Sequence, residues 1–175
     1  MMPVPSHLKG VVVPLNKDIG EDNLSANFRC QCGESRFELL YPGKTHKFGG
    51  KLIPCTIEID GHFFFVLKSR CTSCGHEHLL LDTDFHGWDG FICHDPDQAS
   101  LKRPQLVPWQ CQKCGETKHN GIIHIESQGE EDFVLEVGED FDVDRWPDAF
   151  SWFSMDLTCC KCGLESQNII SVETM

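Results

Sequence analysis

The sequence has little positive charge. Its 15 lysines and arginines stand against 27 aspartates and glutamates, a formal net charge of −12. A nucleic-acid surface is expected to be basic, because contacts to the phosphate backbone dominate its affinity. Direct binding of DNA or RNA is therefore disfavoured. A nucleic-acid-associated protein remains an alternative because of one small basic face, made of Arg29, Arg36, Lys44, Lys47 and Lys51.

Long apolar runs are also missing. No segment approaches the ~18 apolar residues of a membrane-spanning helix, so no membrane association is expected. The N-terminal segment lacks a basic stretch followed by an apolar run, and Pro14 interrupts the valines at 11–13. A secretory signal is thus not expected, and the sequence predicts a cytoplasmic protein.

Motifs that carry catalysis are absent as well. The chain has no HExxH motif, no nucleophile elbow and no phosphate-binding loop, so we expect a non-enzymatic protein, and no small-molecule substrate is indicated. Nothing long has the 3.6-residue apolar period and the caps of a helix. The sequence permits one helical turn, at 144–148.

Cysteine, in contrast, is abundant. The eleven cysteines are an odd number and cannot all pair within one chain, which in a leaderless protein favours metal-binding thiols over a disulfide framework. Eight of them form four knuckles, each followed at once by glycine. The knuckles are Cys30-Gln31-Cys32-Gly33, Cys71-Thr72-Ser73-Cys74-Gly75, Cys111-Gln112-Lys113-Cys114-Gly115 and Cys159-Cys160-Lys161-Cys162-Gly163.

Each pair of knuckles is expected to hold one metal ion. Two cysteines in a tight turn direct both sulfurs at one ion, and a second turn completes a tetrahedron at Zn–S distances of about 2.3 Å. Glycine supplies the positive φ that such a turn tends to need. Site one is assigned to Cys30, Cys32, Cys71 and Cys74, and site two to Cys111, Cys114, Cys159 and Cys162.

The knuckles resemble those of zinc-ribbon and rubredoxin-like proteins, over the knuckles and their flanking strands only. The resemblance implies two structural Zn²⁺ ions, because four thiolates leave no open position for water. Iron in the same ligands would make a one-electron carrier. Cys30-Gln31-Cys32 departs from the pattern, with one spacer residue instead of two. Cys160 is either a bystander or an alternative ligand.

The knuckles also divide the chain into two similar halves. Residues 29–34 align with 110–116, and 70–75 with 158–163, which indicates an internal duplication. We predict an all-β, metal-stabilised fold of two tandem zinc-ribbon-like units with little helix. The expected parts are an N-terminal arm or edge segment at 1–25, unit one at 26–94, a proline-containing linker at 95–108 and unit two at 109–175.

The expected strands are short. Asp60-Gly61, between β-rich runs at 56–59 and 62–67, predicts a hairpin with a two-residue turn. Further strands are expected at 79–81, 121–125, 133–137, 150–157 and 168–170.

Residues 81–95 have no equivalent in the second half. Acids and histidines alternate there around two glycines, and the candidate functional residues are Asp84, His86, Trp88, Asp89 and His94. A metalloenzyme that uses the loop from Asp82 to Asp89 is one alternative. The favoured interpretation is a glycine-turned loop in which Trp88 packs on the ribbon and the acids face water.

Residues 130–148 carry nine acids against Arg145 alone. This segment is either a solvated loop that maintains solubility or, with aromatic residues among the acids, a surface that docks on a basic partner protein. The candidate partner-binding residues are Glu130, Glu131, Asp132, Asp140, Asp142, Asp144 and Trp146. The sequence thus favours a zinc-stabilised interaction module. Size and acidity suggest a bacterial or phage accessory, inhibitor or immunity protein.

Overall fold

The computed structural model describes residues 2–15, 20–93, 103–138 and 141–175. Strands predominate in these ranges and the helices are short, so the predicted small, mostly β fold with little helix is confirmed. No helix in the described part of the chain is long and apolar enough to cross a membrane.

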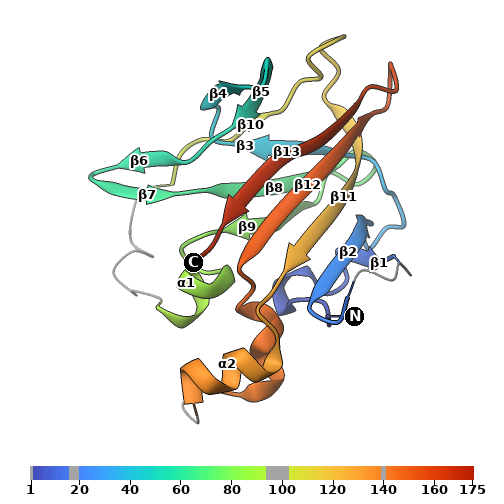
Figure 1. The fold of residues 1–175 in the computed structure, drawn as a ribbon. Coiled ribbons are helices and arrows are strands. Elements are labelled where there is room, and N and C mark those ends of the chain that lie inside the picture. The colour runs from blue at the N-terminus through green and yellow to red at the C-terminus, as the bar shows by residue number, and fades with distance from the viewer. Residues whose placement is uncertain (1, 16–19, 94–102, 139–140) are drawn as a thin grey trace.

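One nine-stranded antiparallel sheet forms the body of the molecule (Figure 1). It runs in the order β1–β2–β11–β3–β8–β9, while β12 and β13 extend it from β11 and β10 pairs with β3. The strands are β1 (Val12–Pro14), β2 (Asn23–Phe28), β3 (Phe37–Tyr41), β8 (Val66–Cys71), β9 (Glu77–Asp82), β10 (Val107–Pro108), β11 (Lys118–Glu126), β12 (Trp152–Cys159) and β13 (Glu165–Glu173). The strands expected at 79–81, 121–125, 150–157 and 168–170 are therefore confirmed.

Strand β11 joins the two cysteine-containing halves. One of its edges pairs with β12. The other is shared, because residues 122–126 pair with β2 and residues 118–119 pair with β3. The sheet thus continues from one half into the other, and β10 lies at the end of the expected linker. Residues 95–102 of that linker lie outside the described residues.

A hydrophobic core also extends across both halves. Phe28 from the first half and Ile123 and Phe153 from the second belong to the same buried cluster. The N-terminal segment adds Met2 and Leu8, the latter from the short helix η1 (Ser6–Leu8). A shared core means that disorder in one half removes packing from the other.

Two hairpins form small sheets of their own (Figure 1). Strands β6 (Ile57–Ile59) and β7 (His62–Phe64) flank Asp60 and Gly61, whose φ angles of 53° and 81° suit a type I′ turn, as predicted. Strands β4 (Thr45–Phe48) and β5 (Lys51–Pro54) flank Gly49-Gly50. This second hairpin was not expected, although a Gly-Gly step between two short β-rich runs is a hairpin signal.

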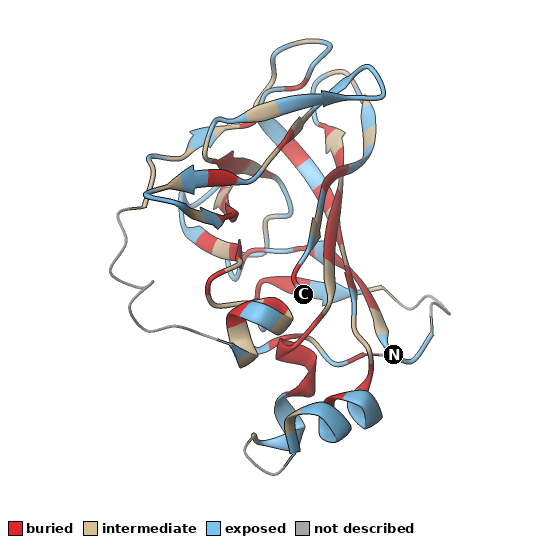
Figure 2. Ribbon diagram, turned by 60° about the vertical axis from the view of Figure 1, so that its left-hand side comes forward, coloured by how far each residue is buried: buried red, intermediate tan, exposed pale blue. Residues whose placement is uncertain are grey.

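The strand predicted at 133–137 is wrong, because these residues belong to the helix α2 (Glu130–Val137). Phe133 and Val137 stand four residues apart on one helical face, and both pack on the core. Three acids in the first turn, Glu130, Glu131 and Asp132, suit the positive end of the helix dipole. Figure 2 shows that most of α2 is exposed.

Two further helices follow the expectations more closely. The helical turn permitted at 144–148 is the 3-10 helix η4 (Val143–Asp148). Residues 87–92 of the glycine-turned loop form the short helix α1 (Gly87–Ile92). Trp88 and Phe91 in α1 are half-buried against the core.

Candidate metal centres

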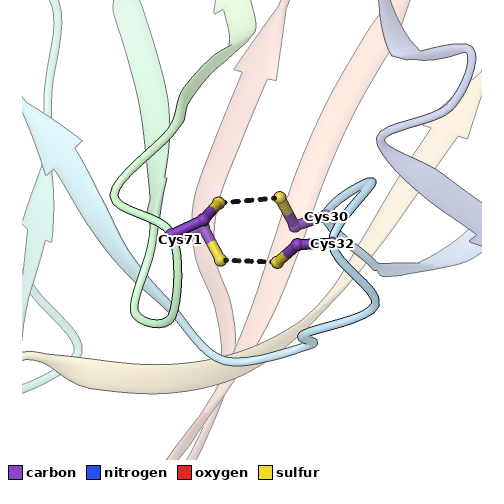
Figure 3. Close-up of side chains that lie close together, drawn as sticks. Cys30, Cys32 and Cys71 are labelled. Atoms are coloured by element: carbon purple, nitrogen blue, oxygen red, sulfur yellow. Dashed lines mark hydrogen bonds between the residues drawn. The ribbon is translucent and has the colours of Figure 1, made fainter.

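Each predicted set of four cysteines comes together. In each set the sulfur atoms all lie within 4.8 Å of one another. In site one, Cys30 Sγ is 3.6 Å from Cys74 Sγ, and Cys32 Sγ is 3.5 Å from Cys71 Sγ. Figure 3 shows Cys30 and Cys32 facing the turn that carries Cys71.

Site two has nearly the same dimensions. Cys111 Sγ is 3.6 Å from Cys162 Sγ, and Cys114 Sγ is 3.6 Å from Cys159 Sγ. Cys160 is not among its four sulfurs and is exposed.

These separations fit a tetrahedral metal ion. Four sulfurs at about 2.3 Å from zinc lie about 3.8 Å apart, whereas disulfide sulfurs are about 2.05 Å apart. All eleven cysteines are free thiols. A donor set made only of thiolates suits zinc or iron and not the hard cations magnesium and calcium.

Paired strands hold the two halves of each site. Site one lies between the β2–β3 connection and the β8–β9 turn, and site two between the β10–β11 connection and the β12–β13 turn. Phe37 pairs with Cys71, and His119 pairs with Cys159. Phe37 and His119 also pair with each other where β3 meets β11. Matching positions of the two halves therefore meet at the junction, as around a local two-fold axis.

Two backbone hydrogen bonds close each knuckle. In Cys71–Cys74, the Cys71 N–H donates to the His76 carbonyl at 2.9 Å, and the Gly75 N–H donates to the Cys71 carbonyl at 3.0 Å. Both knuckles of site two repeat this pattern. All four knuckle glycines have positive φ, between 68° and 91°.

The irregular knuckle keeps both closing bonds, each shortened by one residue. The Cys30 N–H donates to the Glu34 carbonyl and the Gly33 N–H to the Cys30 carbonyl, both at 2.8 Å. A single spacer residue is thus accommodated by a tighter turn without removing Cys32 from the site.

Backbone donors favour thiolate formation in both sites. Burial has the largest single effect and raises the pKa of Cys71, but the N–H groups of Cys74 and Ser73 and the neighbouring Cys32 and Cys74 thiols together lower the pKa to about 7. Cys159 follows the same pattern with the N–H groups of Cys162 and Lys161, and its pKa is also about 7. Thiolate is the form that binds metal, so the turns prepare one ligand in each site near neutral pH.

Site one differs from site two in its surroundings. His78 is buried, and its Nε2 lies 3.3 Å from Cys30 Sγ. Burial first, and then the neighbouring His76, lower the pKa of His78, so a neutral ring contacts the sulfur. Cys32 and Cys74 are exposed beside a hollow of about 500 Å³. The corresponding site-two cysteines, Cys114 and Cys162, are half-buried.

We therefore expect site one to release its metal first. Its exposed thiolates are open to a chelator, and we expect metal release from site one to be roughly tenfold faster. This is the lower end of the about 10–100-fold by which groups around the ligands change metal affinity. Release to a coloured chelator should follow two phases of equal amplitude. Cys32→Ser should remove the fast phase and Cys114→Ser the slow one. A single phase, or the opposite assignment, contradicts the prediction.

Two acids of the candidate loop, Asp82 and Asp84, are held inside the molecule. The buried Asp84 carboxylate is 2.6 Å from Arg103 Nη1 and 2.7 Å from His62 Nε2. The second nitrogen of Arg103, Nη2, lies 3.3 Å from Asp82. The Asp82 N–H donates to Nδ1 of His86, which leaves that ring nitrogen without a proton.

The remaining loop residues do not come together in a group that could bind a metal ion. Trp88 packs edge-on against Phe133, and Asp89 is exposed. Apart from the two cysteine sets, the described residues contain no group of three or more metal ligands. His94 lies outside the described residues.

Part of the acidic segment comes together in space. Glu130, Glu131 and Asp132 line a hollow of about 570 Å³ beside Trp146. Asp142 instead caps η4, where it accepts the Asp144 N–H at 3.2 Å. Asp144 is exposed, and Asp140 lies outside the described residues.

The sequence did not reveal two further acids of this hollow. Glu21 and Asp22 come from the connection between β1 and β2. Asp22 packs against Gly129, where a Cβ would lie only 2.8 Å from its carboxylate oxygen. No local pattern predicts this, because it depends on the long-range pairing of β2 with β11. These five acids with Trp146 and α2 are called the acidic end below.

Fold and sites define a small, mostly β protein with two groups of four cysteines, each group suited to one metal ion. Comparison of the chain with protein-family models, with curated proteins and with solved structures found no match.

Proposed function

We propose that this protein is a non-enzymatic, zinc-stabilised module that binds a basic partner protein through its acidic end. The observation that carries the proposal is the convergence of five carboxylates, from two separate chain segments, on one hollow beside Trp146. Among the described residues, none of these carboxylates forms an ion pair with lysine or arginine. Their charge is therefore free to act on a partner.

The metal sites support a scaffold role. Four thiolates around zinc form a closed site, as in the zinc-ribbon knuckles that these turns resemble, and leave no position for a reacting water. Each such site carries a formal charge of about −2, from four thiolates and one Zn²⁺. The net charge of −12 therefore becomes still more negative, which steers a basic protein toward the module.

Apolar surface accompanies the acids. Leu135 in α2 is 82% exposed and Val134 is 39% exposed. A surface that combines charge with exposed apolar groups is typical of protein interfaces rather than of a purely solubilising face. An accessory, inhibitor or immunity role fits a small acidic chain that covers a basic partner.

Charge reversal at the acidic end tests the proposal. We expect Glu130→Lys/Glu131→Lys/Asp132→Lys to weaken binding of a captured basic protein at least tenfold, which is about 1.4 kcal/mol. The measurement is capture from a cell extract, identification of a stoichiometric partner, and titration with the purified partner.

The matched control reverses three exposed acids elsewhere, Glu58→Lys/Glu77→Lys/Glu165→Lys, and changes the net charge equally. It should retain the affinity. Equal weakening by both variants, or a captured foreign partner that is not basic, would contradict the proposal.

A further inference from the structure

The hairpin β4–β5 concentrates the positive charge that the rest of the chain lacks. Its residues 44–54, called the lysine hairpin below, carry Lys44, Lys47 and Lys51 and no acid. All three lysines are exposed, and none pairs with a described carboxylate. Phe48, beside the turn, is 72% exposed. An exposed aromatic residue among lysines indicates a contact surface.

A hollow separates the hairpin from site two. It has a volume of about 590 Å³ and is lined by Leu52 and Val107, with Lys113 among its residues. Tyr41 and Trp109, which pack edge to face at 5.5 Å, also line it. The hollow thus combines apolar side chains with the amides of Gln110 and Gln112, and Lys113 adds positive charge.

The site-two knuckle holds the hairpin in place. Gln112, between the ligands Cys111 and Cys114, donates from Nε2 to the Leu52 carbonyl at 2.7 Å. The Leu52 N–H donates to Gln112 Oε1 at 3.3 Å. The hairpin and the hollow therefore form one surface whose position depends on site two.

The same chain carries a surface of complementary chemistry. Helix α2 exposes Leu135 and Val134, with Glu131, Asp132 and Glu136 close by in the helix and no basic residue. Acids around an exposed leucine match a lysine-rich hairpin beside a hollow with apolar walls, in sign and in polarity. The two surfaces lie at opposite ends of the molecule (Figure 1), so they do not meet within one chain.

We propose that the lysine hairpin and its hollow dock α2 of a second copy of this chain. The inference rests on the proposed function, because it uses the acidic end as the docking surface. The second copy is acidic as a whole but meets that end with its one lysine-rich face. The contact joins unlike surfaces, so copies associate head to tail into rings or open chains. Repulsion between two acidic molecules is screened beyond about 8 Å at physiological ionic strength, whereas contacting charges remain effective.

Charge exchange between two variants tests the docking. One variant is Lys44→Glu/Lys47→Glu/Lys51→Glu, and the other is Glu131→Lys/Asp132→Lys/Glu136→Lys. Sedimentation velocity of the zinc-loaded full chain should show wild-type mass rising with concentration. Each variant alone should associate at least tenfold more weakly. An equimolar mixture should recover the wild-type affinity within about threefold, because the reversed hairpin meets the reversed helix and the unchanged hairpin meets the unchanged helix.

The control Lys9→Glu/Arg29→Glu/Lys118→Glu removes equal positive charge at exposed positions outside the hairpin and should associate like the wild type. Circular dichroism verifies folding of every variant. A wild-type chain that stays monomeric overturns the inference, as does a mixture that stays monomeric. If such a monomer still captures a foreign basic protein through its acidic end, the proposed function stands. If the chain associates with itself as predicted but captures no foreign protein, only the proposal of a foreign partner is refuted.

Discussion

Removal of the metal from both four-cysteine sites is expected to unfold the whole chain in one cooperative transition. Structural zinc contributes roughly 10–16 kcal/mol of apparent folding free energy in small zinc domains, which equals or exceeds the ~5–15 kcal/mol net stability of a typical domain. The sequence alone suggests that chelation unfolds one unit at a time. The shared strand β11 and the common core instead couple the halves.

The measurement is far-ultraviolet circular dichroism during titration with a strong chelator under reducing conditions. Ellipticity and tryptophan fluorescence should change together, and added zinc should restore both. Cys71→Ser/Cys159→Ser, which removes a ligand from each site, should unfold the chain nearly as completely as chelation. Cys93→Ser, a matched change at an exposed cysteine outside both sites, should leave it folded. Ellipticity that survives complete zinc removal, or two separate transitions, would contradict the expectation.

Acid is expected to destabilise the fold through a half-buried pair of stacked histidines. His7 and His86 stack at 3.7 Å between ring centroids, and His7 Nε2 lies 3.1 Å from the Leu80 carbonyl. Burial lowers the pKa of His7 to about 4 and that of His86 to about 3, although Asp148 opposes both shifts. Both rings therefore stay neutral in the folded state at pH 5.

The sign follows from proton binding. The unfolded chain protonates each histidine near pH 6.5, and the folded chain does not until about pH 4 or 3. The unfolded state thus binds more protons in this window, so stability is complete above pH 6.5 and falls as the pH is lowered. Each histidine lowers the free energy of unfolding by up to about 1.4 kcal/mol for each pH unit of acidification. The pair together lowers it by up to about 3 kcal/mol per pH unit.

Denaturant unfolding at pH 7.0, 6.0 and 5.0 with saturating zinc measures this slope. His86→Asn keeps an acceptor for the Asp82 N–H and should reduce the slope by up to about 1.4 kcal/mol per pH unit. The control His46→Asn replaces an exposed histidine and should leave the slope unchanged. The account of the stack is wrong if both variants show the wild-type slope.

The metal sites were predictable because their information is local. Spacing and glycine fix each knuckle, and even the short Cys30-Gln31-Cys32 turn needs only its own two closing bonds. The Asp60-Gly61 hairpin is local in the same sense. The apolar run at 133–137 was misassigned because it suits a strand or a helix, and the packing of Phe133 and Val137 against the core decides between them.

What the sequence left open depends on long-range pairing. Nothing in 118–126 shows that β11 pairs with both β2 and β3, or that Phe37 meets His119. The acids of the 81–95 loop were expected to face solvent, but Asp84 is buried against Arg103. The convergence of Glu21 and Asp22 with α2 has the same origin.

Metal stoichiometry tests the central claim most directly. Native mass spectrometry of the reduced, folded chain, combined with elemental analysis, should show two zinc ions per chain. Cys32→Ser and Cys114→Ser should each lose one ion, and Cys160→Ser should lose none. Fewer than two ions on a folded wild-type chain, iron in place of zinc, or a third tightly bound equivalent would contradict two closed four-cysteine zinc sites.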